Sequence, residues 1–352
     1  MQASAAATQP ASTAVAVSHP QAAALVGPKM KAMVHDRYGP PDLLTLRDID
    51  RPSVGDTEVL IRVRAAGLHI GDCFGVRGSP FPMRLVTGLR RPTHGIPGFD
   101  VAGQVEAVGR KVTRFRPGDE VFGTCKAACA EFVCAPADTL APMPAGLTFE
   151  EAAALPTSAL AALHGLRDAG RVQPGQQVLI NGASGGVGSF AVQLAKAFGA
   201  QVTGVCGTSN IELVRSLGAD HAIDHTRQDF AQGGPRYDLM LDNVENRSLA
   251  DCRRALKPGG TLILNSGTGA TGIALLVRLL KPLLLSPFVG HTLRRYLSTP
   301  GHADLVVLKD LVEAGTLRPV IDRVYPLHET AAALRHIETG HARGKVVIGL
   351  PG

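Results

Sequence analysis

The sequence predicts an α/β fold in which a doubly wound parallel sheet is joined to a second, β-rich domain. The chain has 352 residues, of which 45% are hydrophobic and 19% charged, so it is long enough for two domains with buried cores. Up to about residue 150, short strand-like runs are separated by Gly, Pro and Asp. Beyond that point strands and helices alternate, which is the pattern of a parallel sheet with helices on both faces.

The β-rich part is predicted from runs of strand length at residues 31–35, 58–66, 101–108 and 130–135. Thr148 and Glu151 then form a capping box, which opens an alanine-rich helix that is interrupted at Pro156. We therefore expect the change from β-rich to alternating structure close to this helix.

The alternating part begins with a buried-type strand at 177–181, followed by a helix whose apolar positions run from Val187 to Phe198 and which ends at Gly199. Further strands are predicted at 201–206, 239–242, 261–265, 320–325 and 345–350. Further helices are predicted at 211–217, 249–256 and 329–338, with a turn at 257–260.

The N-terminal segment is unlike the rest of the chain, because its first 28 residues contain no Lys, Arg, Asp or Glu. It has neither the basic start and apolar core of a secretory signal nor the arginines of a mitochondrial transit peptide. We expect residues 1–29 to be a disordered tail and the protein to be cytoplasmic. The most apolar run, 273–290, contains Arg278, Lys281 and two prolines, so we expect no stable membrane insertion.

Composition excludes other classes of protein. Aromatic residues make up 4% of the chain, Trp is absent and the basic residues are dispersed, so we expect no nucleic-acid binding. The net charge of +6 favours anionic small molecules instead. Six cysteines in a chain of this length are not a disulfide framework, and they form no paired CxxC. The hydrolase motifs GxSxG and HExxH are also absent.

The strongest motif is a glycine-rich turn, residues 181–188 with the sequence NGASGGVG, between a predicted strand and a predicted helix. Aligned on G-x-G-x-x-G, it places Ala183, Gly185 and Gly188 at the three glycine positions, with Gly186 and Val187 between the last two. Gly185 would let the backbone approach a pyrophosphate, and Gly188 would let the helix pack closely on the sheet. The context predicts a dinucleotide site, whereas the turn alone would be only a tight connection.

The end of the next strand indicates which dinucleotide is bound. Enzymes that use NAD carry an acidic residue there, but this chain has Cys206. The polar residues Thr208, Ser209 and Asn210 follow and could hydrogen-bond a phosphate, although they could equally form a turn that caps the next helix. The sequence therefore predicts NADPH rather than NADH.

Two residues after a predicted strand are candidates for catalysis. His69 could donate a proton or a hydrogen bond to a carbonyl oxygen, and an ordinary loop histidine is as good an interpretation. Asp72 is a weaker candidate for proton transfer, since a structural hydrogen-bond acceptor is the simpler interpretation.

With these residues in view, the chain from about residue 31 resembles the medium-chain dehydrogenase/reductase superfamily, in its zinc-free quinone-oxidoreductase-like branch. The segments that carry the resemblance are 67–78, 98–109, 116–121, the glycine-rich turn, 256–260 and 341–348. The resemblance implies a GroES-like catalytic domain from 30–153 and 318–352, and a Rossmann NADP-binding domain from 154–317. Zinc-dependent relatives have Cys at the position of His69 and Gly-His-Glu at the positions of 98–100. Because Phe99 cannot bind zinc, we expect no metal.

The resemblance also implies an activity, hydride transfer from NADPH to a quinone or an activated alkene (enone). Thr157 would lie beside the nicotinamide and Lys345 would reach the cofactor's phosphates, although each could also be purely structural. Asn243, Ser266 and Gly267 would complete the cofactor site. Two departures stand out: His69 replaces a frequent Asn, and Glu245 replaces a glycine beside the nicotinamide.

Other functions stay open at this point. One is a zinc-independent, NADP-dependent alcohol or carbonyl oxidoreductase with His69 as the acid, and another is a non-enzymatic NADPH-binding scaffold or sensor. The leucine-rich segment 273–297 could be core, could wall an apolar acceptor pocket or could meet a partner subunit. Its basic flank, Lys281, Arg294 and Arg295, also permits loose contact with a membrane surface, which is the least favoured alternative. We expect a wall over a small-molecule, apolar acceptor, with part of the surface available to a homodimer.

Overall fold

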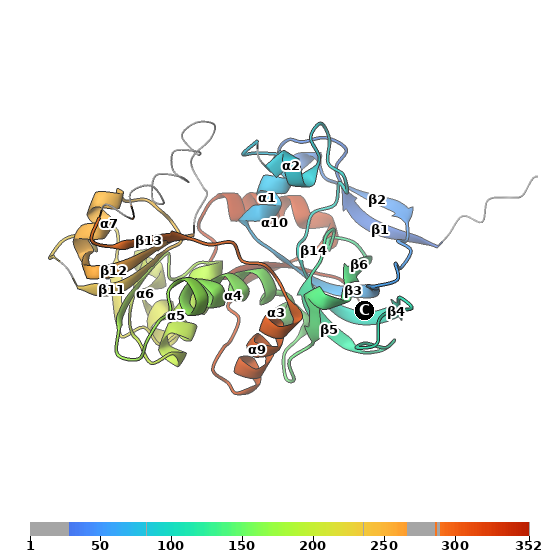
Figure 1. Cartoon of the computed structure of the whole chain (residues 1–352). Coiled ribbons are helices and arrows are strands. Elements are labelled where there is room, and N and C mark those ends of the chain that lie inside the picture. Colours follow the sequence, from blue (N-terminus) through green and yellow to red (C-terminus); the bar gives the residue numbers. More distant parts are fainter. Residues whose placement is uncertain (1–27, 82, 235, 266–285, 287–288, 352) are drawn as a thin grey trace, which may run out of the picture.

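The computed structural model describes residues 28–351 except 82, 235, 266–285 and 287–288 (Figure 1). It contains two large sheets, one mostly antiparallel and one wholly parallel, which confirms the predicted fold class. Nearly all of the expected tail lies outside the described residues, but its last residue, Lys29, already begins strand β1 (Lys29–Val34). The domain boundaries expected from the resemblance stay predictions.

The first lobe is built on a seven-stranded sheet. Its order is β14 (Ile321–Pro326), β15 (Lys345–Gly349), β3 (Glu58–Leu68), β4 (Asp100–Val108), β5 (Glu120–Thr124) and β7 (Leu140–Pro142), and β6 (Phe132–Pro136) also pairs with β3. Only β14 and β15 are parallel, and β15 returns from the C-terminal end of the chain to lie antiparallel to β3. A separate antiparallel pair joins β1 to β2 (Thr45–Asp50).

Short helices surround this first sheet. They are α1 (Ile70–Arg77), α2 (Met83–Thr87), α3 (Phe149–Ala153) and α10 (Thr330–Glu338). The capping box predicted at the start of α3 is present, since Thr148 Oγ1 accepts from the Glu151 amide and the Glu151 carboxylate accepts from the Thr148 amide. Helix α1 was not predicted, because the apolar positions of its eight residues form no long periodic pattern.

The second lobe is a doubly wound parallel sheet. Its order is β10 (His221–Asp224), β9 (Gln201–Cys206), β8 (Gln177–Asn181), β11 (Tyr237–Asp242), β12 (Leu256–Leu264) and β13 (Thr292–Arg295). Its helices are α4 (Pro156–Leu163), continued by a π-helix at His164–Ala169, then α5 (Gly186–Ala197), α6 (Ile211–Ser216), α7 (Leu249–Ala255) and α9 (His302–Glu313). The strand order reverses between β8 and β11, and ligands of such sheets bind outside the strand ends at that point.

One prediction in this lobe is wrong. The expected turn at 257–260 is part of strand β12, which runs unbroken from Leu256 to Leu264. Its register against β11 shifts there, because Tyr237 pairs with Leu256 while Leu239 pairs with Thr261. The proline and two glycines therefore make a bulge within the strand, which is a position where such residues are tolerated.

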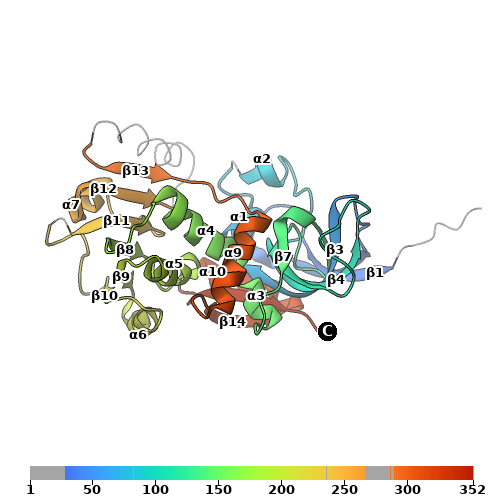
Figure 2. The same cartoon turned by 60° about the horizontal axis from the view of Figure 1, so that its bottom comes forward.

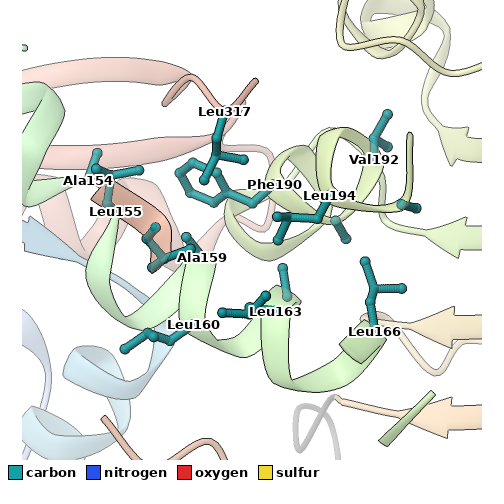
Figure 3. Close-up of a cluster of buried hydrophobic side chains, with 14 of the residues drawn as sticks. Ala154, Leu155, Ala159, Leu160, Leu163, Leu166, Phe190, Val192, Leu194 and Leu317 are labelled. Atoms are coloured by element: carbon teal, nitrogen blue, oxygen red, sulfur yellow. The ribbon is translucent and has the colours of Figure 1, made fainter. Parts of the chain in front are cut away.

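A continuous apolar core joins the two lobes. Figure 3 shows Leu155, Leu160 and Leu163, from α4 and the residue before it, packed in one cluster with Phe190 and Leu194 of α5. The same cluster extends to fully buried residues of the first sheet, Ala65, Ala102 and Phe122. Because cores of this kind are close-packed, the two lobes are held in a fixed relation and the space between them has a defined shape.

Candidate active site

The glycine-rich turn has the geometry that phosphate binding requires. Gly182 has a φ of +76°, and a Cβ at Gly188 would lie 2.0 Å from the Gly182 carbonyl oxygen, so a side chain fits at neither position. Gly185 is the N-cap of the twelve-residue helix α5 and provides no side-chain cap. The first amide groups of α5 therefore lack intrahelical partners and, with the helix dipole, favour an anion.

These amides border a groove of about 550 Å³, here called the glycine groove. It is lined by Gly182, residues 184–188, Ser209, Asn210, Asn243 and the C-terminal residues 340–346. The last segment is tied to the turn, since the Gly344 amide donates to Ser184 O at 2.8 Å. Glycines at a helix N-terminus are suited to bind the phosphates of a dinucleotide.

The groove includes many of the predicted cofactor residues, but not all of them. Gly185, Gly186, Val187 and Gly188 line it, as do Ser209, Asn210 and Asn243. Ala183 is instead fully buried and donates its amide to Val205 O, and the Thr208 hydroxyl donates to Asp224 at 2.6 Å. Ser266, Gly267 and most of the predicted wall at 273–297 lie outside the described residues.

The end of β9 shows which groups surround the position where an acidic residue is missing. Burial raises the pKa of Cys206 to about 11, so the thiol carries no charge at neutral pH. Two basic side chains that the sequence did not single out also line this part of the groove, His225 and Arg343, and an Arg343 guanidinium nitrogen donates to Ser209 O at 3.3 Å. The nearby carboxylate, Asp224 on β10, is occupied by the hydroxyls of Thr208 and Thr226.

A second, larger cavity of about 840 Å³ meets the glycine groove. This space is here called the large cavity, and its walls include Ile96, Phe99, Cys125, Phe132 and Thr157. His69 lines both spaces, while Thr157 lines the large cavity and its neighbour Ser158 lines the groove. The structure thus brings the predicted residues His69 and Thr157 to the junction of a mostly apolar cavity and the glycine groove.

The orientation of His69 follows from its place at the start of α1. The ring Nδ1 accepts the Gly71 amide at 2.9 Å, so the neutral ring carries its proton on Nε2. Nε2 is buried without a hydrogen-bond partner, and the ring stacks on Phe99 with centroids 5.5 Å apart. A buried donor without a partner is costly, and a ligand carbonyl oxygen would satisfy it.

Asp72 is buried next to His69 and is hydrogen-bonded to the backbone. Its carboxylate accepts the His69 amide at 2.8 Å and the Gly98 amide at 2.8 Å, and it lines neither the large cavity nor the groove. Burial raises the pKa of this carboxyl. These contacts suit a residue that positions His69, and a catalytic role for Asp72 stays a prediction.

Asp100 on β4 connects the two lobes next to the junction of the large cavity and the glycine groove. Its Oδ1 accepts the Thr157 amide at 3.0 Å and the Thr157 hydroxyl, while its Oδ2 lies 3.2 Å from Lys345 Nζ. Lys345 Nζ also donates to Ser158 Oγ at 3.1 Å, and both charged side chains are almost completely buried. Lys345 lines the groove through its stem, and its reach to a phosphate stays a prediction.

Contacts around Glu245 show how the chain accommodates a glutamate where relatives of the family have glycine. Its φ is +56°, in the left-handed region that glycine favours, and its amide donates to Asp242 at 2.8 Å. The side chain is buried and forms an ion pair with Arg295 at 2.6 Å. Contacts from two strand ends therefore hold the turn that would otherwise need a glycine.

Among the described residues, no group of three or more His, Cys, Asp and Glu side chains converges as a metal site would. The absence of zinc stays a prediction that rests on Phe99. None of the described helices is long and apolar enough to cross a bilayer.

Comparisons with known proteins agree with this architecture. Residues 55–165 match the family model of the alcohol dehydrogenase GroES-like domain, and residues 217–348 match that of the zinc-binding dehydrogenases. The chain is 33% identical to 2-methylene-furan-3-one reductase of Solanum lycopersicum, over 96% of this chain and 84% of the relative. It is 32% identical to quinone oxidoreductase of Sus scrofa, over 90% of this chain and 95% of the relative.

A solved structure gives the same result. The quinone oxidoreductase from Coxiella burnetii superposes with a TM-score of 0.80 at 32% identity, covering 92% of this chain and all of that one. The chain belongs to the medium-chain dehydrogenase/reductase superfamily, in its quinone-oxidoreductase-like branch. It is an oxidoreductase that uses a nicotinamide cofactor.

Proposed function

We propose that the protein is an NADPH-dependent reductase of quinones or activated alkenes that needs no zinc. The observation that carries the proposal is the buried Nε2–H of His69 at the junction of the glycine groove and the large cavity, which makes no hydrogen bond and lies 3.8 Å from Asp72 Oδ2. Relatives named as a furanone reductase and as quinone oxidoreductases support this acceptor class. The apolar walls at Ile96, Phe99 and Phe132 favour acceptors that bind by area removed from water.

The residues of this chain have separate parts in the reaction. Bound NADPH would supply a hydride to the acceptor's carbon. His69 Nε2–H donates a hydrogen bond to the acceptor oxygen, which stabilises the negative charge that develops there and can pass on the proton. Phe99 restricts the imidazole by stacking, and Asp72 fixes the backbone at His69. The enolate or hydroquinone anion that hydride transfer produces is already delocalised, so a metal is not needed to polarise the acceptor's oxygen.

The preference for NADPH rests on charge at the end of β9. A neutral Cys206 repels no phosphate, while Arg343 and His225 offer donors to a 2′-phosphate. A relative in Arabidopsis thaliana is named NADPH-dependent alkenal/one oxidoreductase, which supports the same cofactor. The cytosol is the proposed compartment, although several relatives are named as mitochondrial or chloroplastic.

The test is NADPH oxidation against quinones, enones and aldehydes, with His69→Phe beside a matched control, His328→Phe. His328 is exposed and lines neither the large cavity nor the glycine groove. We expect turnover with quinones or enones, a fall of about tenfold to hundredfold in kcat/KM for His69→Phe, and little change for the control. Chelators should leave the rate unchanged, and elemental analysis should find no zinc.

Two other results of the NADPH-oxidation assay would replace this proposal. Turnover of aldehydes or secondary alcohols alone would replace the proposal by the carbonyl oxidoreductase. Tight NADPH binding without turnover of any acceptor would indicate a scaffold or sensor.

A further inference from the structure

The segment around helix α2 exposes large apolar side chains at an unusual density. Phe81, Leu85 and Leu89 are 62%, 73% and 57% exposed and lie within nine residues of one another in sequence. Figures 1 and 2 both show α2 at the periphery of the molecule, outside α1. Scattered exposed leucines need no explanation, but three together in one short segment indicate a surface that meets something apolar.

The same segment is strongly basic. Between Asp72 and Asp100 the chain has four arginines and no Asp or Glu. Three of these arginines, Arg84, Arg90 and Arg91, alternate with the apolar residues, and the last two are exposed. We call the surface formed by Phe81, Arg84, Leu85, Leu89, Arg90 and Arg91 the α2 patch.

The backbone of the α2 patch is braced from within the protein. Arg84 stacks on Tyr38 at 4.7 Å and donates to Gly78 O at 2.9 Å, while the Tyr38 hydroxyl donates to Gly88 O. The Thr93 amide donates to Thr87 O at 2.7 Å, which closes the loop that follows α2. Phe81, Leu85 and Leu89 are therefore exposed on a segment whose backbone is fixed by internal hydrogen bonds.

This surface adjoins the space where the acceptor is proposed to bind. Thr87, Pro92 and His94 line a small cavity of about 70 Å³, and its walls share His94, Ile96 and Phe99 with the large cavity. The loop between the α2 patch and the active site therefore forms part of the wall of both cavities.

We propose that the α2 patch docks the protein on an anionic lipid bilayer. Leucine and phenylalanine that enter the interface, flanked by arginines that meet anionic headgroups, give the two contributions on which peripheral binding depends. A second copy of the chain fits less well, because a two-fold contact would bring two sets of arginines together, and Asp36, the carboxylate that interacts with Arg91, is already paired with Arg47. Docking here would place the large cavity next to the phase in which apolar quinones dissolve.

The experiment is vesicle flotation of the full-length protein with two bilayers: equimolar phosphatidylserine and phosphatidylcholine, and phosphatidylcholine alone. We expect binding to the anionic vesicles that is at least tenfold tighter than binding to the neutral ones, and that weakens as salt is raised. Arg90→Gln with Arg91→Gln should weaken binding by about tenfold or more, and Leu85→Ser with Leu89→Ser by about tenfold. No turnover is measured, so the result is independent of the proposed catalytic function.

The matched control is Leu297→Ser in the second lobe, which removes the most exposed of the leucines that the structure describes, 88% accessible. It should leave vesicle binding unchanged, and all variants should keep the thermal midpoint of the parent. Equal binding to both bilayers, or equal effects of Leu297→Ser and the patch variants, would overturn the proposal. The proposal would also be overturned if the protein did not bind vesicles and light scattering showed a dimer that the leucine variants dissociate. The α2 patch would then be a self-association surface.

Discussion

Lys345 and Asp100 form an ion pair that water does not reach, and replacing Lys345 by methionine distinguishes two roles for the lysine. In the structure its ammonium lies 3.2 Å from Asp100 Oδ2 and 3.1 Å from Ser158 Oγ. The family resemblance instead directs the same lysine to the cofactor's phosphates. Methionine keeps most of the volume of the stem and removes only the charge and its donors.

The loss of stability expected for Lys345→Met depends on the hydrogen bonds that Asp100 would still make. Removing one partner of a buried ion pair costs about 3–5 kcal/mol, because the remaining charge is left desolvated. Asp100 Oδ1 would still accept the amide and hydroxyl of Thr157, so we expect the lower end, about 3 kcal/mol. An unfolding entropy of about 2.1 cal/mol/K per residue makes this a fall of about 4 °C in the melting temperature of a chain this long.

The assay is calorimetry of the cofactor-free protein, followed by fluorescence titration with NADPH. We expect the melting temperature of Lys345→Met to fall in the absence of cofactor, and Asp100→Asn in the same background to recover part of the loss. Lys126→Met, at an exposed lysine on the large cavity, is the matched control. If the cofactor-free melting temperature is unchanged while the dissociation constant for NADPH rises strongly, the structural role is refuted and the phosphate role stands.

Three further predictions follow from single positions. Gly188→Ala should abolish NADPH binding in the fluorescence titration, because its Cβ would lie 2.0 Å from a carbonyl oxygen, whereas Gly301→Ala in open space should not. Threonine hydroxyls lower the pKa of Asp224 to about 2. This carboxylate therefore stabilises the fold above about pH 5 and loses that effect as the pH falls towards 2. Asp224→Asn should make the urea midpoint less dependent on pH across this range. Cys206→Asp should move cofactor preference towards NADH by adding a charge that repels a 2′-phosphate, and unchanged relative affinities would contradict the interpretation of this position.

The parts of the site that the sequence predicted are those encoded by neighbouring residues. The glycine-rich turn could be placed because a strand, a tight turn and a helix start follow one another within a few residues. His69 was recognised for the same reason, as a polar residue directly after a strand, and it is the N-cap of α1.

The parts that could not be predicted depend on distant segments meeting in space. Nothing in the sequence near Asp100 indicates that Lys345 neutralises it, and nothing near Cys206 indicates that Arg343 and His225 lie beside it. The composition of residues 257–260 predicts a turn, yet the pairing of Leu256 and Thr261 with β11 absorbs them as a bulge in β12. Tertiary contacts overrode local preference in that case.

The return of β15 to β3 has a consequence for how the protein is made. Strand β15, which completes the first sheet, and Gly344, which braces the glycine-rich turn, follow every strand of the parallel sheet in the sequence. Most of the parallel sheet can therefore form during synthesis, whereas β3 keeps an unpaired edge until β15 has been made. A variant that lacks residues 344–349 would lose Lys345 and the brace together.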